Sequence, residues 1–114
     1  MVTARTEPDP HRYHALAPLP PEGDLDLRAL APGDGPVEVE IGFGRGRFLY
    51  ERAEALAAPG AGGRIVGIEI KRKWGFLVAE RCAGRGLENV LVWAADAREA
   101  LSRVGPDAQV DRVF

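Results

Sequence analysis

The sequence predicts an α/β domain, that is, a parallel sheet with helices on both of its faces. Two observations predict it. From Val37 onward, short runs of β-branched residues alternate with longer amphipathic runs, and each such pair of runs has about the length of one strand–helix unit. In addition, three glycines two residues apart follow the first strand, where an α/β sheet presents backbone N–H groups to a nucleotide-like ligand. With 114 residues, the chain is one domain at most.

The first two strand–helix units follow each other directly. Val37–Ile41 is the first predicted strand, and Arg47–Ala58 is the first helix because its apolar residues recur with a helical period. A loop of proline, alanine and glycine ends that helix. Arg64–Ile70 is the second strand, and Lys71–Ala83 is the second helix. Gly75 weakens this helix by about 1 kcal/mol relative to alanine, so we expect it to allow close packing.

The third unit is shorter, and the fourth is only begun. Val90–Ala94 is the third predicted strand, and Ala97–Val104 is a short helix that Gly-Pro stops. Asp111–Phe114 is the opening of a fourth strand. A sheet that ends there leaves an apolar edge uncovered. We therefore expect residues 37–114 to form an incomplete domain, truncated at the start of the fourth strand.

Residues 1–36 are predicted to form a mostly irregular N-terminal arm. They hold seven of the nine prolines, and proline fixes φ and removes a hydrogen-bond donor. An extended arm follows, with one short turn at Leu25–Leu30. His11 and His14 lie in it three residues apart, but two histidines without a further ligand nearby do not predict a metal site.

The composition is that of an ordinary soluble globular protein. Hydrophobic residues make up 46% and charged residues 28%, and a net charge of −2 excludes a chain-wide basic field. Residues 64–85 nevertheless hold six basic and two acidic groups. The single cysteine, Cys82, excludes an intrachain disulfide and is expected to be a small buried hydrophobe. No apolar run is long enough to span a bilayer and no signal peptide is evident, so we expect a cytoplasmic protein without a membrane partner.

Three acidic residues fall at the ends of successive predicted strands. Glu40 ends the first strand, Glu69 ends the second and Asp96 follows the third. They are 29 and 27 residues apart, about one strand–helix unit each. Because ligands of open α/β sheets bind beyond the carboxyl ends of the strands, the three acids predict a nucleotide-like site at that edge.

The glycine loop narrows the class of ligand that the site is expected to bind. Its glycines, at Gly42, Gly44 and Gly46, let the backbone turn and approach a ligand closely. A dinucleotide loop would need a glycine where Arg47 stands. With an acid two residues ahead of the first glycine, the loop instead resembles that of S-adenosylmethionine-dependent methyltransferases.

Each acid has a role in such a site. Glu40 is expected either to hold the glycine turn or to accept from the ligand's ammonium group. Glu69 is expected to accept from both ribose hydroxyls, since a carboxylate is a bidentate acceptor. Asp96 is expected to accept from the adenine amino group, while the Ala97 N–H donates to the ring.

A basic run opens the second predicted helix. Lys71, Arg72 and Lys73 place cations at a helix N-terminus, where they oppose the helix dipole. Such a broken local rule favours a function, here contact with substrate phosphates, although a solvated charge cluster is the simpler interpretation. Trp74 and Trp93 are expected to be packing residues.

Together these segments resemble the bacterial tRNA (guanine-N7-)-methyltransferases. The resemblance lies in Val39 to Leu49, Gly67 to Lys73, Gly86 to Val90, Asp96-Ala97 and Val110 to Phe114. It implies a Rossmann-like class I methyltransferase fold, S-adenosyl-L-methionine as cofactor, and methylation of guanine N7 in the tRNA variable loop. It also implies that the residues matching Glu40, Glu69 and Asp96 contact the cofactor. The family's further acid near the methyl-transfer site and much of its tRNA contact are expected downstream of Phe114.

Several alternatives stay open at this point. The chain is either the cofactor-binding part of such an enzyme or a non-catalytic fragment that binds cofactor weakly. Its substrate is alternatively a small molecule or a protein, and a nucleotide-dependent oxidoreductase is a further alternative.

Overall fold

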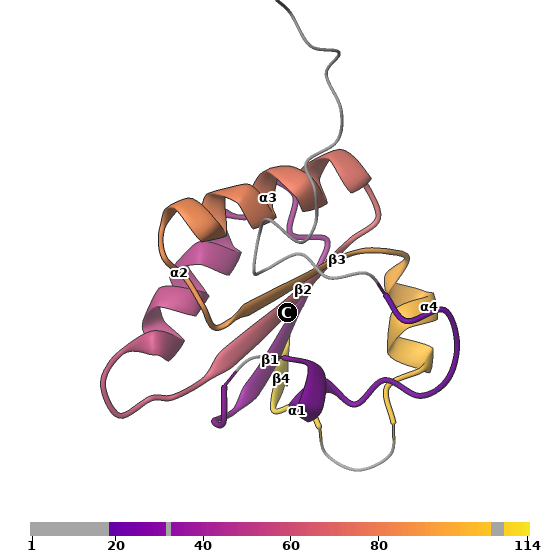
Figure 1. Ribbon diagram of the computed structural model, residues 1–114, viewed down its shortest axis with the longest axis horizontal. Helices are drawn as coiled ribbons and strands as arrows, with labels where there is room; N and C mark the ends of the chain where they lie inside the picture. Colours follow the sequence, from indigo (N-terminus) through magenta and orange to yellow (C-terminus); the bar gives the residue numbers. More distant parts are fainter. Residues whose placement is uncertain (1–18, 32, 106–108) are drawn as a thin grey trace, which may run out of the picture.

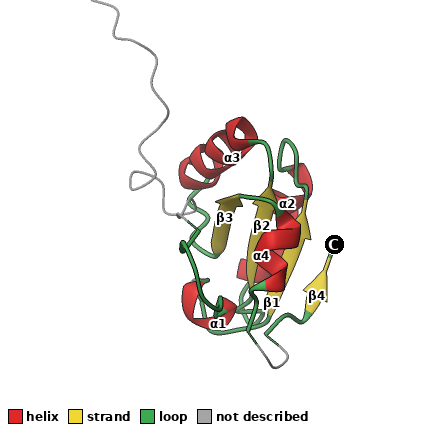
Figure 2. Cartoon of the chain, turned by 90° about the vertical axis from the view of Figure 1, so that its right-hand side faces the viewer, coloured by secondary structure: helices red, strands yellow, loops and turns green. Residues whose placement is uncertain are grey.

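The computed structural model describes residues 19–31, 33–105 and 109–114, and it contains a four-stranded parallel sheet between two helical layers (Figure 1). The strand order is β3-β2-β1-β4. The strands are β1 (Val37–Ile41), β2 (Arg64–Glu69), β3 (Val90–Ala94) and β4 (Arg112–Val113). Figure 2 shows β3 and β4 at opposite sides of the sheet. The predicted parallel sheet with helices on both faces is confirmed.

The first helical layer consists of α2 (Arg47–Ala57) and α3 (Arg72–Gly84), which lie together on one face of the sheet (Figure 1). The predicted helical period is confirmed, because α2 buries one apolar stripe against β2. That stripe consists of Leu49, Tyr50, Ala53 and Leu56. A Cβ on Gly75 would lie 3.0 Å from the Cβ of Ala94, so this glycine allows α3 to approach β3 closely, as predicted.

The expectations for the cysteine and the two tryptophans hold. Cys82 lies on the buried face of α3 and is fully buried in the core, and burial raises the pKa of its thiol to about 12. A thiol with that pKa is inert at neutral pH. Trp93 is only 1% exposed and Trp74 is partly buried against the same core as α2 and α3. All three are packing residues.

The second helical layer contains α4 (Ala97–Ser102), the one-turn helix α1 (Leu27–Leu30) and the chain that precedes α1. Asp26 caps α1 by accepting from the N–H groups of Arg28 and Ala29, so the predicted short turn at Leu25–Leu30 is a helical turn. Leu25 and Leu27 are fully buried on the sheet beside Trp93.

The expectation of an extended arm is therefore wrong for the described residues from 19 onward. Leu25 also pairs with Val104 in an isolated parallel bridge, with the Leu25 N–H 2.6 Å from the carbonyl oxygen of Arg103. The prolines do prevent long regular elements, but the apolar residues between them still find buried positions on the sheet. Residues 1–18, which include His11 and His14, lie outside the described residues.

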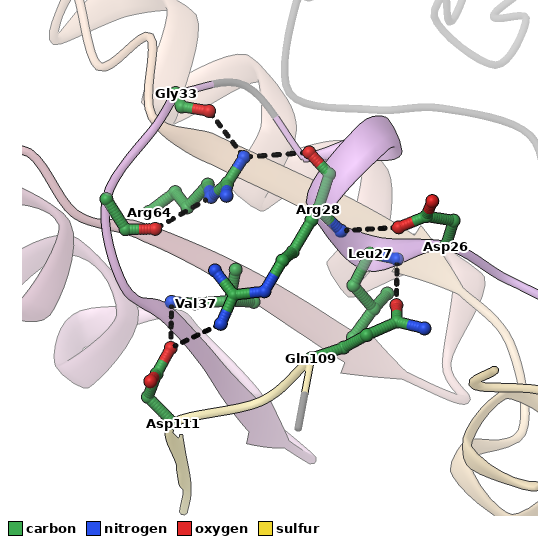
Figure 3. A network of polar contacts seen from close by, with 9 residues as sticks. Asp26, Leu27, Arg28, Gly33, Val37, Arg64, Gln109 and Asp111 are labelled. Atoms are coloured by element: carbon green, nitrogen blue, oxygen red, sulfur yellow. Dashed lines mark hydrogen bonds and ion pairs between the residues drawn. The ribbon is translucent and has the colours of Figure 1, made fainter. Parts of the chain in front are cut away.

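A buried arginine holds this N-terminal segment in place (Figure 3). Arg64, the first residue of β2, is 3% exposed. Its guanidinium donates to the backbone carbonyl oxygens of Arg28 at 2.9 Å, Ala31 at 3.1 Å and Gly35 at 3.2 Å, and also to that of Gly33. One side chain therefore supplies hydrogen-bond donors to four inward-facing carbonyl groups of this loop.

The chain just before β4 holds the same segment from the other side (Figure 3). The Oε1 atom of Gln109 accepts from the Leu27 N–H at 2.6 Å. The carboxylate of Asp111 accepts from the Val37 N–H at 2.8 Å and from Arg28 at 3.4 Å. Residues from both ends of the described chain therefore meet beside β1.

Candidate functional site

The glycine loop connects β1 to α2 as a sequence of left-handed backbone positions. Gly42, Gly44 and Gly46 have φ angles of 69°, 55° and 83°, a region that other residues rarely adopt. The Gly42 N–H donates to the carbonyl oxygen of Ile68 at 2.7 Å, which fixes the start of the loop to β2. The need for glycine at these three positions is thereby explained.

The three glycines differ in what surrounds them. A Cβ on Gly42 or Gly44 would meet nothing within 4 Å, so open space lies beside the backbone there. A Cβ on Gly46 would lie 2.8 Å from Val78 and 2.9 Å from Tyr50. The first two glycines therefore leave room for a ligand, whereas the third allows the loop to pack on α2 and α3.

This difference predicts stability losses of different size for two similar substitutions. Gly46→Ala is expected to lower the free energy of unfolding by about 3 kcal/mol, because left-handed strain and overpacking add. Gly44→Ala is expected to cost only about 1 kcal/mol, from backbone strain alone. Urea denaturation followed by circular dichroism measures both. Equal losses in the two variants would contradict the assignment of Gly46 to packing.

Glu69 is the residue that holds the glycine loop. It ends β2, is 8% exposed, and each of its carboxylate oxygens accepts a backbone N–H. Oε1 lies 3.0 Å from the Gly44 nitrogen, and Oε2 lies 2.9 Å from the Lys71 nitrogen. Each oxygen retains a lone pair for a further donor. The turn-holding role that the sequence offered for Glu40 therefore belongs to Glu69.

Glu40 is the penultimate residue of β1, two residues before Gly42, and one of its oxygens is unsatisfied. Its Oε1 atom is buried and has no hydrogen-bond partner among the residues that the structure describes. Burial raises the pKa of this carboxyl group to about 6. A partly desolvated carboxylate beside an open loop is suited to accept from a cationic ligand group.

Asp96 caps α4 and is paired with the arginine two residues later. Its carboxylate accepts from the Arg98 N–H at 2.9 Å, and its Oδ2 lies 3.1 Å from the Arg98 guanidinium. This side-chain contact, assisted by the backbone N–H, holds the pKa of Asp96 below its usual value. The Arg98 side chain is 92% exposed, so it can move away when a ligand donor needs the carboxylate.

The predicted acids do come together at one edge of the sheet. The parallel register places Glu69 beside Ala94, two residues before Asp96, and places Glu40 beside Gly67 on the neighbouring strand. The Ala95 N–H donates to the carbonyl oxygen of Glu69 at 3.0 Å, which ties the end of β3 to the end of β2. The binding roles of these acids, and of the Ala97 N–H at the start of α4, stay predictions.

The basic run Lys71 to Lys73 lies at the same edge, at the start of α3, and all three residues are exposed. The structure adds a fourth cation that sequence reasoning missed. Arg45 in the glycine loop lies 5.6 Å from the ring centroid of Trp74, and Lys73 lies 4.9 Å from it. The sequence signal that could have identified Arg45 is its position between two glycines of the loop. The glycine loop and α3 together form a basic rim.

The described residues lack two further features, a metal-binding cluster and a membrane-spanning helix. Among the described residues, no three histidine, cysteine, aspartate or glutamate side chains gather closely enough to hold a metal ion. In the same part of the chain, no helix has both the length and the apolar character needed to cross a membrane.

Comparison with known proteins gives a consistent result. Residues 34–114 match the model of a family described as "Putative methyltransferase". The tRNA (guanine-N(7)-)-methyltransferase of Marinobacter nauticus is 36% identical over 92 residues, which are 81% of this chain and 37% of that protein. The enzyme of the same name from Hyphomonas neptunium is 38% identical over 98 residues, 82% of this chain and 40% of that protein. The chain thus spans well under half the length of these curated relatives.

Proposed function

This chain belongs to that methyltransferase family, and from this premise we propose that it is the cofactor-binding part of a tRNA (guanine-N7-)-methyltransferase. The observation that supports the proposal is the group of Glu40, Glu69 and Asp96 around a glycine loop with open space beside Gly42 and Gly44. The proposed cofactor is S-adenosyl-L-methionine, the proposed substrate is guanine N7 in the tRNA variable loop, and the cytoplasm is the proposed location.

The residues present fit that cofactor. Glu69 has lone pairs left for ribose hydroxyls, and Glu40 has a buried oxygen without a donor, which an ammonium group would satisfy. The N–H of Ala97 and the carboxylate of Asp96 stand at the third strand end for the adenine ring. When bound, the cofactor supplies an electrophilic methyl group on a sulfonium sulfur.

In catalysis, the role of this chain is to orient the cofactor toward guanine N7. Guanine N7 already carries a nucleophilic lone pair, so methyl transfer needs alignment rather than a strong base. By holding the glycine loop through Glu69, the protein fixes the backbone against which the ligand lies. By ending three strands at one edge, it fixes the spacing of the groups that hold the ligand.

Tritiated methyl transfer to unmodified tRNA tests the proposal. Because the chain spans about 37% of its Marinobacter relative, a chimera in which residues 34–114 replace the matching segment of that relative is assayed beside the chain itself. We expect the chimera to label tRNA at a single guanine, mapped by chemical cleavage at N7-methylguanosine. Label at another position, or on no RNA while the chimera is folded, would refute the proposal.

We further propose that the basic rim of Arg45, Lys71, Arg72 and Lys73 contacts tRNA phosphates. Replacing Lys71 and Lys73 with alanine in the chimera is expected to weaken tRNA binding. It should also reduce the slope of log affinity against log salt concentration by about 0.7 to 0.9 for each phosphate that the variant no longer neutralises. Arg81→Ala, an exposed cation at the other end of α3, is the matched control and should leave the slope unchanged. An unchanged slope in the lysine variant would exclude the rim from the tRNA interface.

A further inference from the structure

Glu40 and Glu69 lie near the carboxyl ends of neighbouring strands, but among the described residues the fold satisfies both oxygens of only one of them. Both oxygens of Glu69 accept backbone N–H groups, whereas the Oε1 atom of Glu40 is buried without a partner among the described residues. An ionised oxygen that is shut off from water and lacks a donor costs free energy, more than a neutral group would. In the absence of ligand, the fold therefore disfavours the ionised form of Glu40 relative to an exposed glutamate.

The charged groups on the same strand and on the covering helix do not relieve Glu40. Strand alternation puts Glu38 on the same face of the sheet as Glu40. Arg52 of α2 lies on that face, but its guanidinium is bonded to both oxygens of Glu38, at 2.8 and 2.6 Å. The cation that α2 brings to this part of β1 is therefore engaged with the neighbouring acid.

The neighbouring strands do not supply a cation either. On β2, Glu40 lies opposite Gly67, which has no side chain, and the next residue on that face is the acid Glu69. On β4, Arg112 lies opposite Glu38 rather than Glu40, and it is exposed. At the carboxyl end, the chain continues into Gly42, beside the open space. The approach that remains for a cation is from the ligand side.

We propose that Glu40 accepts the cationic ammonium group of the cofactor and releases a proton as that group arrives, so that cofactor binding is coupled to pH. This inference rests on the proposed function, and it adds a regulation of the same site. The proton leaves the carboxyl oxygen for solvent, and the resulting carboxylate receives the ammonium N–H donors. No covalent bond other than this O–H bond changes.

The sign of the coupling follows from the titration of Glu40. Burial raises its pKa to about 6, so a large fraction of the ligand-free protein is protonated there below that pH. An adjacent ammonium group favours the carboxylate and lowers this pKa. Affinity should therefore be constant from about pH 7 up to the alkaline pH at which the ligand's own ammonium group deprotonates, and it should fall as pH drops through 6. The same raised pKa makes the ligand-free fold lose stability as pH rises from about 4.5 to about 6.

Calorimetric titration with S-adenosylhomocysteine, in buffers of different ionisation enthalpy, tests the coupling. For a pKa of about 6, affinity should be about fourfold weaker at pH 5.5 than at pH 7.5. About three-quarters of a proton should be released per ligand at pH 5.5, and almost none at pH 7.5. As a control ligand, 5′-methylthioadenosine lacks the ammonium group and should release no proton.

Two variants separate Glu40 from other titrating groups, including the histidines of the N-terminal segment. Glu40→Gln should bind S-adenosylhomocysteine more weakly at pH 7.5 and lose both the pH dependence and the proton release. Glu51→Gln, an exposed acid on α2, should keep both. Proton release that persists in Glu40→Gln would overturn the coupling. Binding by the wild-type chain without any pH dependence would overturn it while leaving the cofactor site intact, and no binding at either pH would overturn both.

Discussion

Replacing Arg64 with methionine is expected to remove about 3 kcal/mol of unfolding free energy, a large fraction of what a domain of this size possesses. Arg64 is 3% exposed, and its guanidinium donates to four backbone carbonyl groups of the segment from Arg28 to Gly35. Methionine fills most of the volume but donates nothing, so those carbonyl groups are left without donors inside the fold. The substitution should also loosen α1, whose docking depends on this segment.

Urea denaturation of the wild type and of two variants measures the effect of Arg64. Arg64→Lys keeps the charge but lacks the planar fork, so it should recover only part of the stability. Arg47→Met is the matched control, because that side chain is 91% exposed and its partner among the described residues is Glu51, in an ion pair one turn away. The control should cost less than about 0.5 kcal/mol. Equal losses for Arg64→Met and Arg47→Met would show that the buried arginine does not stabilise the N-terminal segment.

Replacing Glu69 with alanine is expected to weaken S-adenosylhomocysteine binding by about 100-fold or more. Two contributions add. The variant cannot form the proposed hydrogen bonds from ribose hydroxyls to the carboxylate, and such charge-assisted bonds are each worth roughly 1.5–3 kcal/mol. In addition, the Gly44 and Lys71 N–H groups lose their acceptor, so the glycine loop is no longer held in its binding conformation.

Calorimetry on Glu69→Ala is interpreted beside two further variants. Glu69→Gln keeps the shape and one acceptor oxygen, so it should weaken binding less than alanine does. Glu80→Ala removes an exposed acid from the middle of α3 and should bind like the wild type. Circular dichroism shows whether each variant is folded. A folded Glu69→Ala protein that binds within about threefold of the wild type would exclude Glu69 from the ligand site, given the size of such bonds.

Local sequence patterns were sufficient for the elements that carry the site. The glycines at 42, 44 and 46 predicted left-handed backbone because few other residues adopt it, and all three have positive φ. The acids at 40, 69 and 96 predicted one shared edge, because parallel strands of similar length end together, and the register places them there. The helix boundaries differ from those predicted by one or two residues, with α2 ending at Ala57 and α4 at Ser102.

Contacts between distant segments could not be predicted in the same way. Nothing in the local pattern around Arg64 distinguishes a buried guanidinium from a surface charge at the start of a strand. Its partners lie 29 to 36 residues earlier, in a proline-rich stretch that composition alone marks as an arm. Likewise, Gln109 and Asp111 lie more than 70 residues from the N–H groups that they bind.

The sequence by itself determined the α/β class, the order of the elements and the edge at which the three acids lie, because backbone geometry and strand alternation are local properties. Only the tertiary structure decided which contacts each of those residues makes. It bonds Glu69 to the glycine loop, leaves the Oε1 atom of Glu40 without a donor among the described residues, adds Arg45 to the basic rim and packs Leu25 and Leu27 onto the sheet. The physical reason is that hydrogen-bond satisfaction and burial depend on what the whole fold places around a group.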